Sequence, residues 1–190
     1  MRDIIESSAE ETTETAEAIP LPVLLREHTR RLQRKSTIIN AVFFIVVFVV
    51  AAIVCTFFSF PEVRGNSMEP YYVEGERVFA VKSKNIKIGD VVIAYNKELD
   101  QHIVKRVVGV AGDHIEIKNN KFYRNGTEVY EAFIVDFKLS ADNVKYDDVV
   151  VPENAVYVLG DNRSRSTDSR FLGPISIDDI EYKVLSKLKT

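Results

Sequence analysis

The side chains best suited to covalent chemistry are one serine and one lysine in separate segments. The octapeptide "VRGNSMEP", residues 63–70, places Ser67 in a short turn between a glycine and a proline. A serine hydroxyl is a weak nucleophile at neutral pH and needs a neighbouring base. The segment alone is also explained by Asn66 and Ser67 capping a turn. Any base must therefore come from another part of the chain.

Lys105 is the first candidate for that base. It lies in "HIVKRVVGVAGD", residues 102–113, which predicts a strand. Lys105 and Arg106 point to opposite faces of such a strand, and each face is otherwise apolar. If one is buried, lysine is the better candidate, because arginine cannot lose its proton. Lowering the lysine pKa from about 10.4 to about 7–8 costs about 4 kcal/mol and creates a general base for a Ser–Lys pair.

Two alternatives to a lysine base stay open at this stage. The strand could lie on the surface, with both basic groups solvated. A histidine could also act as the base. His102 is three residues from Lys105, so in a regular strand it faces the other way, and His114 follows the "AGD" turn without a predicted direction.

A third segment concentrates polar side chains in one loop. In "LGDNRSRSTDSR", residues 159–170, Gly160 is expected to permit an unusual backbone turn. Asp–Arg pairs at this spacing can brace a loop through charge-assisted hydrogen bonds, and hydroxyls can orient an amine without adding charge. A solvated polar loop is the simpler alternative. The polar residues are Asp161, Asn162, Arg163, Ser164, Ser166, Asp168 and Arg170.

A membrane anchor precedes these segments. The run Ile38–Phe60 holds 23 residues without a charge, a glycine or a proline, which is long enough for a spanning helix. It is too long for the apolar core of a signal peptide and ends in phenylalanines, so we expect it to stay uncleaved. Residues 26–35 carry five Arg or Lys and one Glu, which predicts a cytoplasmic N-terminus.

The rest of the chain predicts a mainly β protein. Residues 61–190 are expected to form one mostly antiparallel β domain outside the cell, after a cytoplasmic tail, 1–37, and a transmembrane helix, 38–60. The tail is acidic up to about residue 19 and then basic. "KNNK" and "RNGT" predict hairpin turns. The expected strands are "RVFAV", "DVVIAY", "HIVKRVVGV", "HIEI", "KFY", "TEVY", "YDDVVV" and "AVYVLG".

Composition argues against several other classes of protein. The formal net charge of −3 gives no indication of nucleic-acid binding. The single cysteine, Cys55, lies in the apolar run, so neither an intrachain disulfide nor a cysteine metal site can form. Only His102 and His114 follow the anchor, which argues against a metal enzyme built on histidines.

The three segments, in this order after one anchor, resemble type I signal peptidase. "IKIGDVVIAY", residues 86–95, is similar to a further block of that family. The resemblance covers Val63 to about Gly173 and the anchor, and the segment 160–170 is its most specific part. A single anchor and a compact domain resemble the branch common in Gram-positive bacteria. The lysine differs from the histidine of the endoplasmic-reticulum branch.

The resemblance implies a membrane-bound serine endopeptidase that removes signal peptides from exported preproteins. Such enzymes cut after small residues at positions −3 and −1 and use no metal or cofactor. By resemblance, Ser67 is the nucleophile, Lys105 the general base, and Ser166 the hydroxyl that hydrogen-bonds the lysine. The charged residues that match those shaping the family's site are Asp161, Arg163, Asp168 and Arg170.

One position departs from part of the family. Gly65 stands where one branch has a serine in the oxyanion hole. The oxyanion would then depend on backbone N–H groups, including that of Ser67. Small substrate pockets would select small side chains by excluding large ones. Candidate pocket walls are Val63, Met68 and Val104.

Location and partners follow from the same expectations. Ser67 lies seven residues beyond Phe60, so at most about 25 Å of extended chain separates it from the anchor. We expect a single-pass protein of the cell membrane whose partners are the lipid bilayer and exported preproteins. The sequence does not fix the oligomeric state, and a monomer is the default expectation. A self-cleaving Ser–Lys protease, like the repressors of the SOS response, and a non-catalytic anchored β module stay as alternatives.

Overall fold

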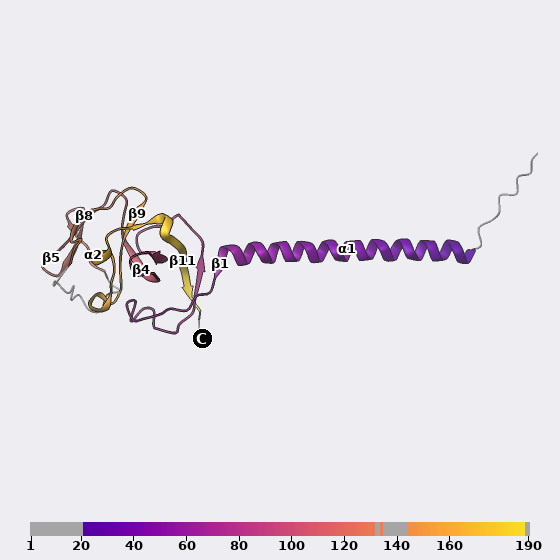
Figure 1. Cartoon of the computed structure of the whole chain (residues 1–190), viewed down its shortest axis with the longest axis horizontal. Helices are drawn as coiled ribbons and strands as arrows, with labels where there is room; N and C mark the ends of the chain where they lie inside the picture. Colours follow the sequence, from indigo (N-terminus) through magenta and orange to yellow (C-terminus); the bar gives the residue numbers. More distant parts are fainter. Residues whose placement is uncertain (1–20, 132–133, 135–143, 189–190) are drawn as a thin grey trace, which may run out of the picture. The chain divides into compact units, whose positions relative to one another are not determined.

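The computed structural model describes residues 21–131, 134 and 144–188. The chain divides into two compact units, Met1–Ala51 and Ala52–Thr190. The described part of the first unit is a stretch of helix α1, Leu21–Phe57 (Figure 1). Pro22 lies in the first turn of α1, where a missing backbone N–H breaks no helical hydrogen bond.

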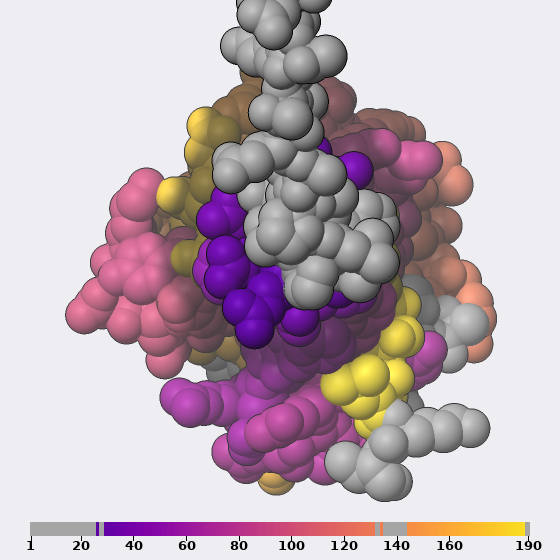
Figure 2. Space-filling model, turned by 90° about the vertical axis from the view of Figure 1, so that its right-hand side faces the viewer, coloured from indigo at the N-terminus to yellow at the C-terminus, as the bar shows by residue number. Residues whose placement is uncertain are grey.

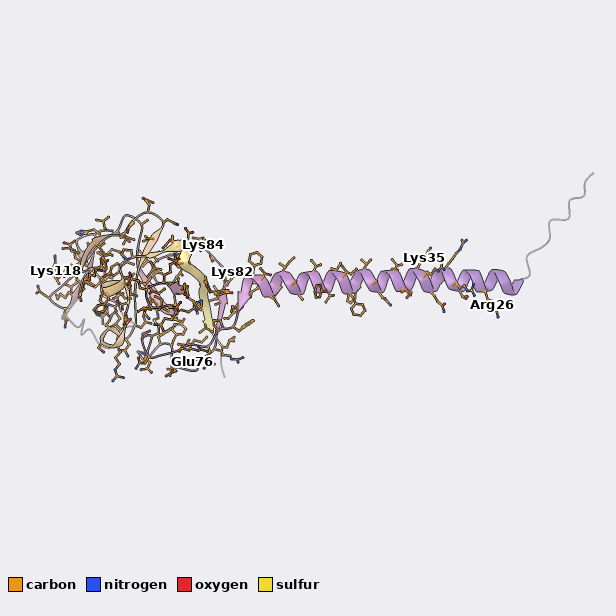
Figure 3. The ribbon with its side chains drawn as sticks, viewed as in Figure 1. Arg26, Lys35, Glu76, Lys82, Lys84 and Lys118 are labelled. Atoms are coloured by element: carbon orange, nitrogen blue, oxygen red, sulfur yellow. The ribbon has the colours of Figure 1, made fainter. Side chains whose placement is uncertain are left out.

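Helix α1 differs in its bounds from the helix predicted over residues 38–60. It also includes the basic segment, and Arg26 and Lys35 both lie on α1 ahead of the apolar run (Figure 3). It ends at Phe57 because the next two residues leave the helix and pair with another strand. The stretch Thr29–Phe57 is long and apolar enough to cross a bilayer. Its large apolar side chains, such as Phe44 and Phe48, are exposed, as expected for a lipid-facing helix.

The second unit holds two antiparallel sheets (Figure 1). In the larger sheet the strand order is β1-β2-β11-β3-β4-β9-β10. Its strands are β1 (Phe58–Ser59), β2 (Val78–Val81), β3 (Val91–Asn96), β4 (Gln101–Val110), β9 (Ala155–Leu159), β10 (Ile175–Ser176) and β11 (Ile180–Lys187).

The smaller sheet has the order β7-β6-β5-β8 and is built from two tight hairpins. Asn119 and Asn120, and then Asn125 and Gly126, all have positive φ, as type I′ turns require. Both predicted hairpin turns are therefore confirmed. The strands are β5 (His114–Lys118), β6 (Lys121–Arg124), β7 (Thr127–Glu128) and β8 (Asp148–Val150).

Short helical turns follow β9 and precede β11. They are η1 (Arg163–Arg165), α2 (Ser169–Leu172) and η2 (Ile177–Asp179). η1 lies within the polar loop of residues 159–170, and α2 begins in it, so the loop has regular structure. Asp168 caps the N-terminus of α2, where its side chain accepts a hydrogen bond from the backbone N–H of Arg170.

All eight predicted strands are present, as β2 to β9. The two-residue strands β1 and β10 were not predicted, and neither was the longer β11, which lies between β2 and β3 and pairs with both. Ile180, Tyr182 and Val184 alternate with polar residues, so a signal was available. In Figure 2 the yellow residues at the end of β11 lie on the same face as purple and magenta residues that precede β2.

The turn that carries Ser67 is fixed to the core of this unit. Val63 and Met68, on either side of Ser67, are buried with Tyr72 and with residues of β2, β3 and β11 such as Ile93. The backbone N–H of Val63 donates to the carbonyl of Glu76 at 2.8 Å. A turn held by buried side chains on both sides places its serine with little freedom.

We predict that β11 is a core strand on which the domain's stability depends. Ile180→Ala removes a side chain that is 1% exposed and should lower the free energy of unfolding by about 2–5 kcal/mol. Leu185→Ala, on the same strand but 51% exposed, should cost less than about 1 kcal/mol. Chemical denaturation of the full chain in detergent measures both values. Equal losses in the two variants would contradict this role for β11.

Candidate active site

Ser67 and Lys105 meet in the structure, although 38 residues separate them in the chain. The distance between Lys105 Nζ and Ser67 Oγ is 2.8 Å, and Nζ also donates to the carbonyl of Val104 at 3.0 Å. Lys105 lies on β4, opposite Val92 of β3, in the middle of the larger sheet. A general base must be within hydrogen-bond reach of the proton that it removes, and this pair satisfies that condition.

The Lys105 amine is buried, which changes its chemistry. The residue is 4% exposed, and burial lowers the pKa of Lys105 from 10.5 to about 8. The carboxylates of Asp168 and Asp161 act in the opposite direction, and the guanidinium of Arg170 adds to the lowering of the pKa. A substantial fraction of the amine is therefore neutral near pH 8 and can accept the hydroxyl proton of Ser67.

Arg106, the neighbour of Lys105, makes a buried ion pair with the polar loop. Its Nε and Nη2 donate to the two carboxylate oxygens of Asp161 at 2.8 and 2.6 Å. Both side chains are buried. The alternative of a surface strand with two solvated charges is wrong, because Lys105 and Arg106 are both buried.

Asp168 and Arg170 form a second buried pair within the loop. Arg170 Nε lies 2.8 Å from Asp168 Oδ1, and both side chains are inaccessible to solvent. The other carboxylate oxygen of Asp168 accepts from the backbone N–H of Gly160 at 3.0 Å. Arg170 Nη2 donates to the carbonyl of Arg163 at 2.7 Å. The pair thus fixes the two ends of the loop to each other.

Glu131 makes a third pair that the sequence did not indicate. Its carboxylate accepts from Arg163 Nη2 at 2.5 Å, and both side chains are buried. Burial raises the pKa of Glu131, and the nearby Arg163 acts in the opposite direction. Arg163 Nε donates to the carbonyl of Gly160 at 3.0 Å. Because Glu131 lies 32 residues before Arg163 and outside every recognised motif, no local pattern pointed to this contact.

Gly160 and Ser166 differ from what the sequence predicted. A Cβ on Gly160 would clash with Ser166 Oγ and with the backbone oxygen of Ser67. Gly160 is therefore required for close packing, and its φ is not positive as an unusual turn would suggest. Ser166 Oγ is buried and has no hydrogen-bond partner among the described residues, so the expected bond to Lys105 is not formed here.

The two histidines that follow the anchor make other contacts. His102 lies 3.1 Å from Glu181 and packs on the ring of Tyr95. His114 lies 2.6 Å from Asp148 in the smaller sheet. Neither is a hydrogen-bond partner of Ser67, so the geometry favours Lys105 over a histidine as the base.

The candidate oxyanion and pocket residues lie in or beside the turn that carries Ser67. Gly65 has a φ of +77° and an exposed backbone, with no side chain to donate a hydrogen bond. Val63 and Met68 are buried in the core, and Val104 packs against them while half-buried. Their role as substrate pocket walls stays a prediction.

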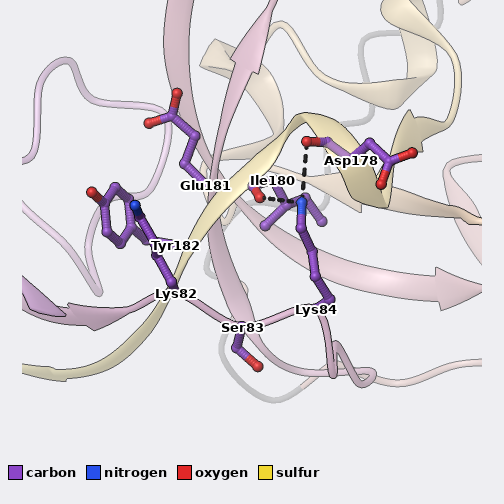
Figure 4. Close-up of a pocket in the computed structure, with 7 residues that line it drawn as sticks. All are labelled: Lys82, Ser83, Lys84, Asp178, Ile180, Glu181 and Tyr182. Carbon is purple, nitrogen blue, oxygen red and sulfur yellow. Dashed lines mark hydrogen bonds between the residues drawn. The ribbon is translucent and has the colours of Figure 1, made fainter. Parts of the chain in front are cut away.

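A surface pocket of about 560 Å³ lies elsewhere in the domain and contains none of the candidate site residues (Figure 4). Within it Lys84 Nζ donates to the carbonyls of Ile177, Asp178 and Ile180 at 2.7 to 3.1 Å. Lys84 therefore links its own segment to η2 and to the start of β11, and this role is structural. In the described part of the chain, no group of three His, Cys, Asp or Glu side chains could hold a metal ion.

Comparisons with known proteins agree on one family. A family model described as "Signal peptidase, peptidase S26" matches residues 35–187. A signal peptidase I P of Bacillus subtilis subsp. natto is 37% identical over 162 residues, covering 78% of this chain and 87% of the relative. Signal peptidase IB of Staphylococcus aureus (strain N315) is 33% identical over 163 residues, covering 76% and 83%. A crystal structure of a signal peptidase I from Enterococcus faecalis V583 covers 54% of this chain and 97% of that chain, with 27% identity and a TM-score of 0.44.

The buried amine should make stability depend on pH in a predictable way. The folded pKa of Lys105 lies below its unfolded value, so the unfolded state binds more protons between about pH 8 and 10.5. The buried amine should therefore lower the wild-type free energy of unfolding by its full amount below pH 8, and this loss should shrink as the pH rises from 8 to 10.5. Lys105→Met has no buried amine and should have a higher free energy of unfolding than wild type at pH 6.5. The difference between the two free energies should be smaller at pH 9 by roughly 1 kcal/mol.

Denaturation of both full-length proteins at the two pH values measures this gap. Lys82→Met, at an exposed position, is the matched control, and its stability relative to wild type should not change with pH in this range. A gap between Lys105→Met and wild type that stays constant from pH 6.5 to 9 would show that the amine does not have a lowered pKa.

Proposed function

Because the chain belongs to the signal peptidase S26 family, we propose that Ser67 and Lys105 are the nucleophile and general base of its peptidase. The protein is a serine endopeptidase of the membrane that removes signal peptides from preproteins. The observation that carries the assignment of residues is the 2.8 Å contact between Ser67 Oγ and a buried Lys105 amine.

The proposed reaction begins with proton transfer within this pair. Neutral Lys105 accepts the hydroxyl proton while Ser67 Oγ attacks the carbonyl carbon of the residue before the scissile bond. The carbonyl oxygen becomes an oxyanion, and in this proposal the backbone N–H of Ser67 stabilises it. Protonated Lys105 then gives its proton to the leaving amine nitrogen, and an acyl-enzyme remains on Ser67.

Water completes the cycle. Lys105, neutral again, takes a proton from the water that attacks the acyl carbon. It returns that proton to Ser67 Oγ as the ester bond breaks, which releases the signal peptide and restores the free enzyme. We propose that the cleaved preproteins have small residues at positions −3 and −1, just before the scissile bond. The half-buried Val104 is the best-placed candidate wall for such a pocket, because Val63 and Met68 lie deeper.

We further propose that the N-terminus is cytoplasmic and that residues 61–190 face the outside. The basic segment 26–35 precedes the apolar run, and cytoplasmic flanks carry an excess of Lys and Arg. After the run, residues 61–70 carry one Arg and two Glu. Exported preproteins emerge on this outer face, so the proposed orientation puts Ser67 on the side where they are processed.

The orientation predicts which positions an impermeant thiol reagent can reach in intact cells. Cys55 is the only cysteine, so Cys55→Ser gives a cysteine-free background. Asn119→Cys, in the exposed turn between β5 and β6, should be labelled without lysis. Ser7→Cys should be labelled only after lysis. The reverse pattern would show the opposite orientation.

The proposed dyad predicts the activity of three variants. Ser67→Ala and Lys105→Ala should each lower cleavage of an added preprotein by about 10⁴-fold or more, because each removes a member of one catalytic unit. Lys105→Arg should be equally inactive, since a guanidinium does not lose its proton at neutral pH. N-terminal sequencing of the product checks that the cut follows the signal peptide.

Two further readouts separate the alternatives. The wild-type rate should rise with pH through an apparent pKa of about 8, as Lys105 becomes neutral. The enzyme itself should keep its full length throughout, because a chain that shortens itself would favour the self-cleaving alternative. Full activity in Ser67→Ala or Lys105→Ala would reject the dyad.

A further inference from the structure

We propose that Asn162 is a positioning residue that aims the backbone N–H of Ser67 at the oxyanion of the reaction. The proposal rests on the assigned roles of Ser67 and Lys105 and concerns how the oxyanion site is built. Asn162 lies in the polar loop between Asp161 and Arg163, and neither its type nor its place in the loop had suggested a role.

Asn162 makes two hydrogen bonds to the backbone of the nucleophile turn. Its own backbone N–H donates to the carbonyl of Ser67 at 3.0 Å. Its side-chain Nδ2 donates to the carbonyl of Asn66 at 3.1 Å. The two acceptors belong to the peptide groups on either side of the Ser67 Cα, so one residue holds both.

Planarity of the peptide group converts this contact into an orientation of the donor. The Asn66 carbonyl and the Ser67 N–H belong to one trans peptide and point in opposite directions. A bond that fixes the carbonyl therefore fixes the direction of the N–H. The Ser67 N–H donates to no group in the described part of the chain, so it is free to receive an oxyanion. Gly65 offers no side chain that could take over this task.

The amide of Asn162 is itself held in one orientation. Its Oδ1 accepts from the hydroxyl of Ser164 at 3.2 Å, which turns Nδ2 toward Asn66. The Asn66 carbonyl also accepts from the backbone N–H of Glu69 at 3.3 Å, and a carbonyl oxygen has lone pairs for both donors. The contact is therefore part of a connected set of bonds across the turn and the loop.

The backbone at Asn162 is fixed from both sides by buried charges. Asp161 is bound by Arg106, and Arg163 is bound by Glu131. The residues flanking Asn162 are 1% and 2% exposed, whereas Asn162 is half-buried at the edge of the site. The ion pairs thus give a role to Glu131 as well, because they hold the peptide from which Asn162 reaches the nucleophile turn.

Asn162→Ala tests the proposal in the full-length enzyme in detergent. It removes the Nδ2 contact and keeps the backbone bond to Ser67, so the loop stays attached. We expect kcat for preprotein cleavage to fall about 10- to 100-fold with KM unchanged, less than the 10²–10³-fold typical of removing an oxyanion donor outright. The pH profile should keep its apparent pKa of about 8, because the Lys105 contacts are untouched. Asn162→Asp has the same shape without an N–H donor and should not restore kcat.

Paired inhibitors distinguish positioning from a general loss of structure. A peptide aldehyde with the cleavage-site sequence adds to Ser67 Oγ and forms an oxyanion, with the hydroxyl proton taken by Lys105. The corresponding peptide alcohol binds without forming one. In Asn162→Ala the aldehyde should bind about 10-fold or more weakly while the alcohol binds as before. The ratio of the two dissociation constants is measured on one protein sample, so it does not depend on the fraction of that sample that is folded.

Two controls separate this proposal from the proposed function. Arg165→Ala alters an exposed side chain of the same turn and should keep the wild-type kcat and aldehyde-to-alcohol ratio. Full activity in Ser67→Ala would reject the dyad and this inference together. Suppose that Ser67→Ala is inactive but Asn162→Ala keeps the wild-type kcat and the wild-type ratio of aldehyde to alcohol binding. That result would overturn the role of Asn162 and leave the dyad in place. Equal weakening of aldehyde and alcohol would also overturn it, because that pattern indicates a disturbed binding site.

Discussion

The removal of the Lys105 amine from water is the constraint on which this site depends. Lowering its pKa from 10.5 to about 8 corresponds to about 3 kcal/mol, which the rest of the domain must offset. The lysine can be held there because β4 lies inside the larger sheet and Ser67 is carried against it by the buried Val63 and Met68. A reactive base at neutral pH and a loss of stability therefore have the same physical origin.

The other buried charges near Lys105 form ion pairs with one another, and none of these pairs includes the Lys105 amine. Each of the three buried carboxylates in or against the loop is matched by an arginine, in the pairs Arg106–Asp161, Asp168–Arg170 and Glu131–Arg163. The hydrogen-bond partners of Lys105 Nζ are Ser67 Oγ and the Val104 carbonyl. A direct contact with a carboxylate would stabilise the ammonium and raise the pKa of Lys105 beyond the effect that Asp168 and Asp161 have from a distance. Buried pairs contribute little net stability but are costly to break. Their remaining hydrogen bonds go to the loop backbone, which gives the loop a defined shape.

The loop and the nucleophile turn are complementary at the level of backbone atoms. Gly160 is small enough for the loop to approach Ser67, and Asn162 then binds the two carbonyls beside the nucleophile. A site that relies on peptide N–H groups needs those peptides to be held before substrate arrives. The ion pairs, the glycine and the asparagine satisfy this need where Gly65 provides no hydroxyl.

The sequence alone predicted the anchor, eight of the strands, both hairpin turns and the pairing of Ser67 with Lys105. These depend on local patterns: apolar length, alternation of side chains and short motifs. The tertiary structure decided the central place of β11, the pairing of Glu131 with Arg163, the packing role of Gly160 and the contacts of Asn162. These join residues far apart in the chain, and burial and hydrogen bonding act through distances in space, which no local pattern records.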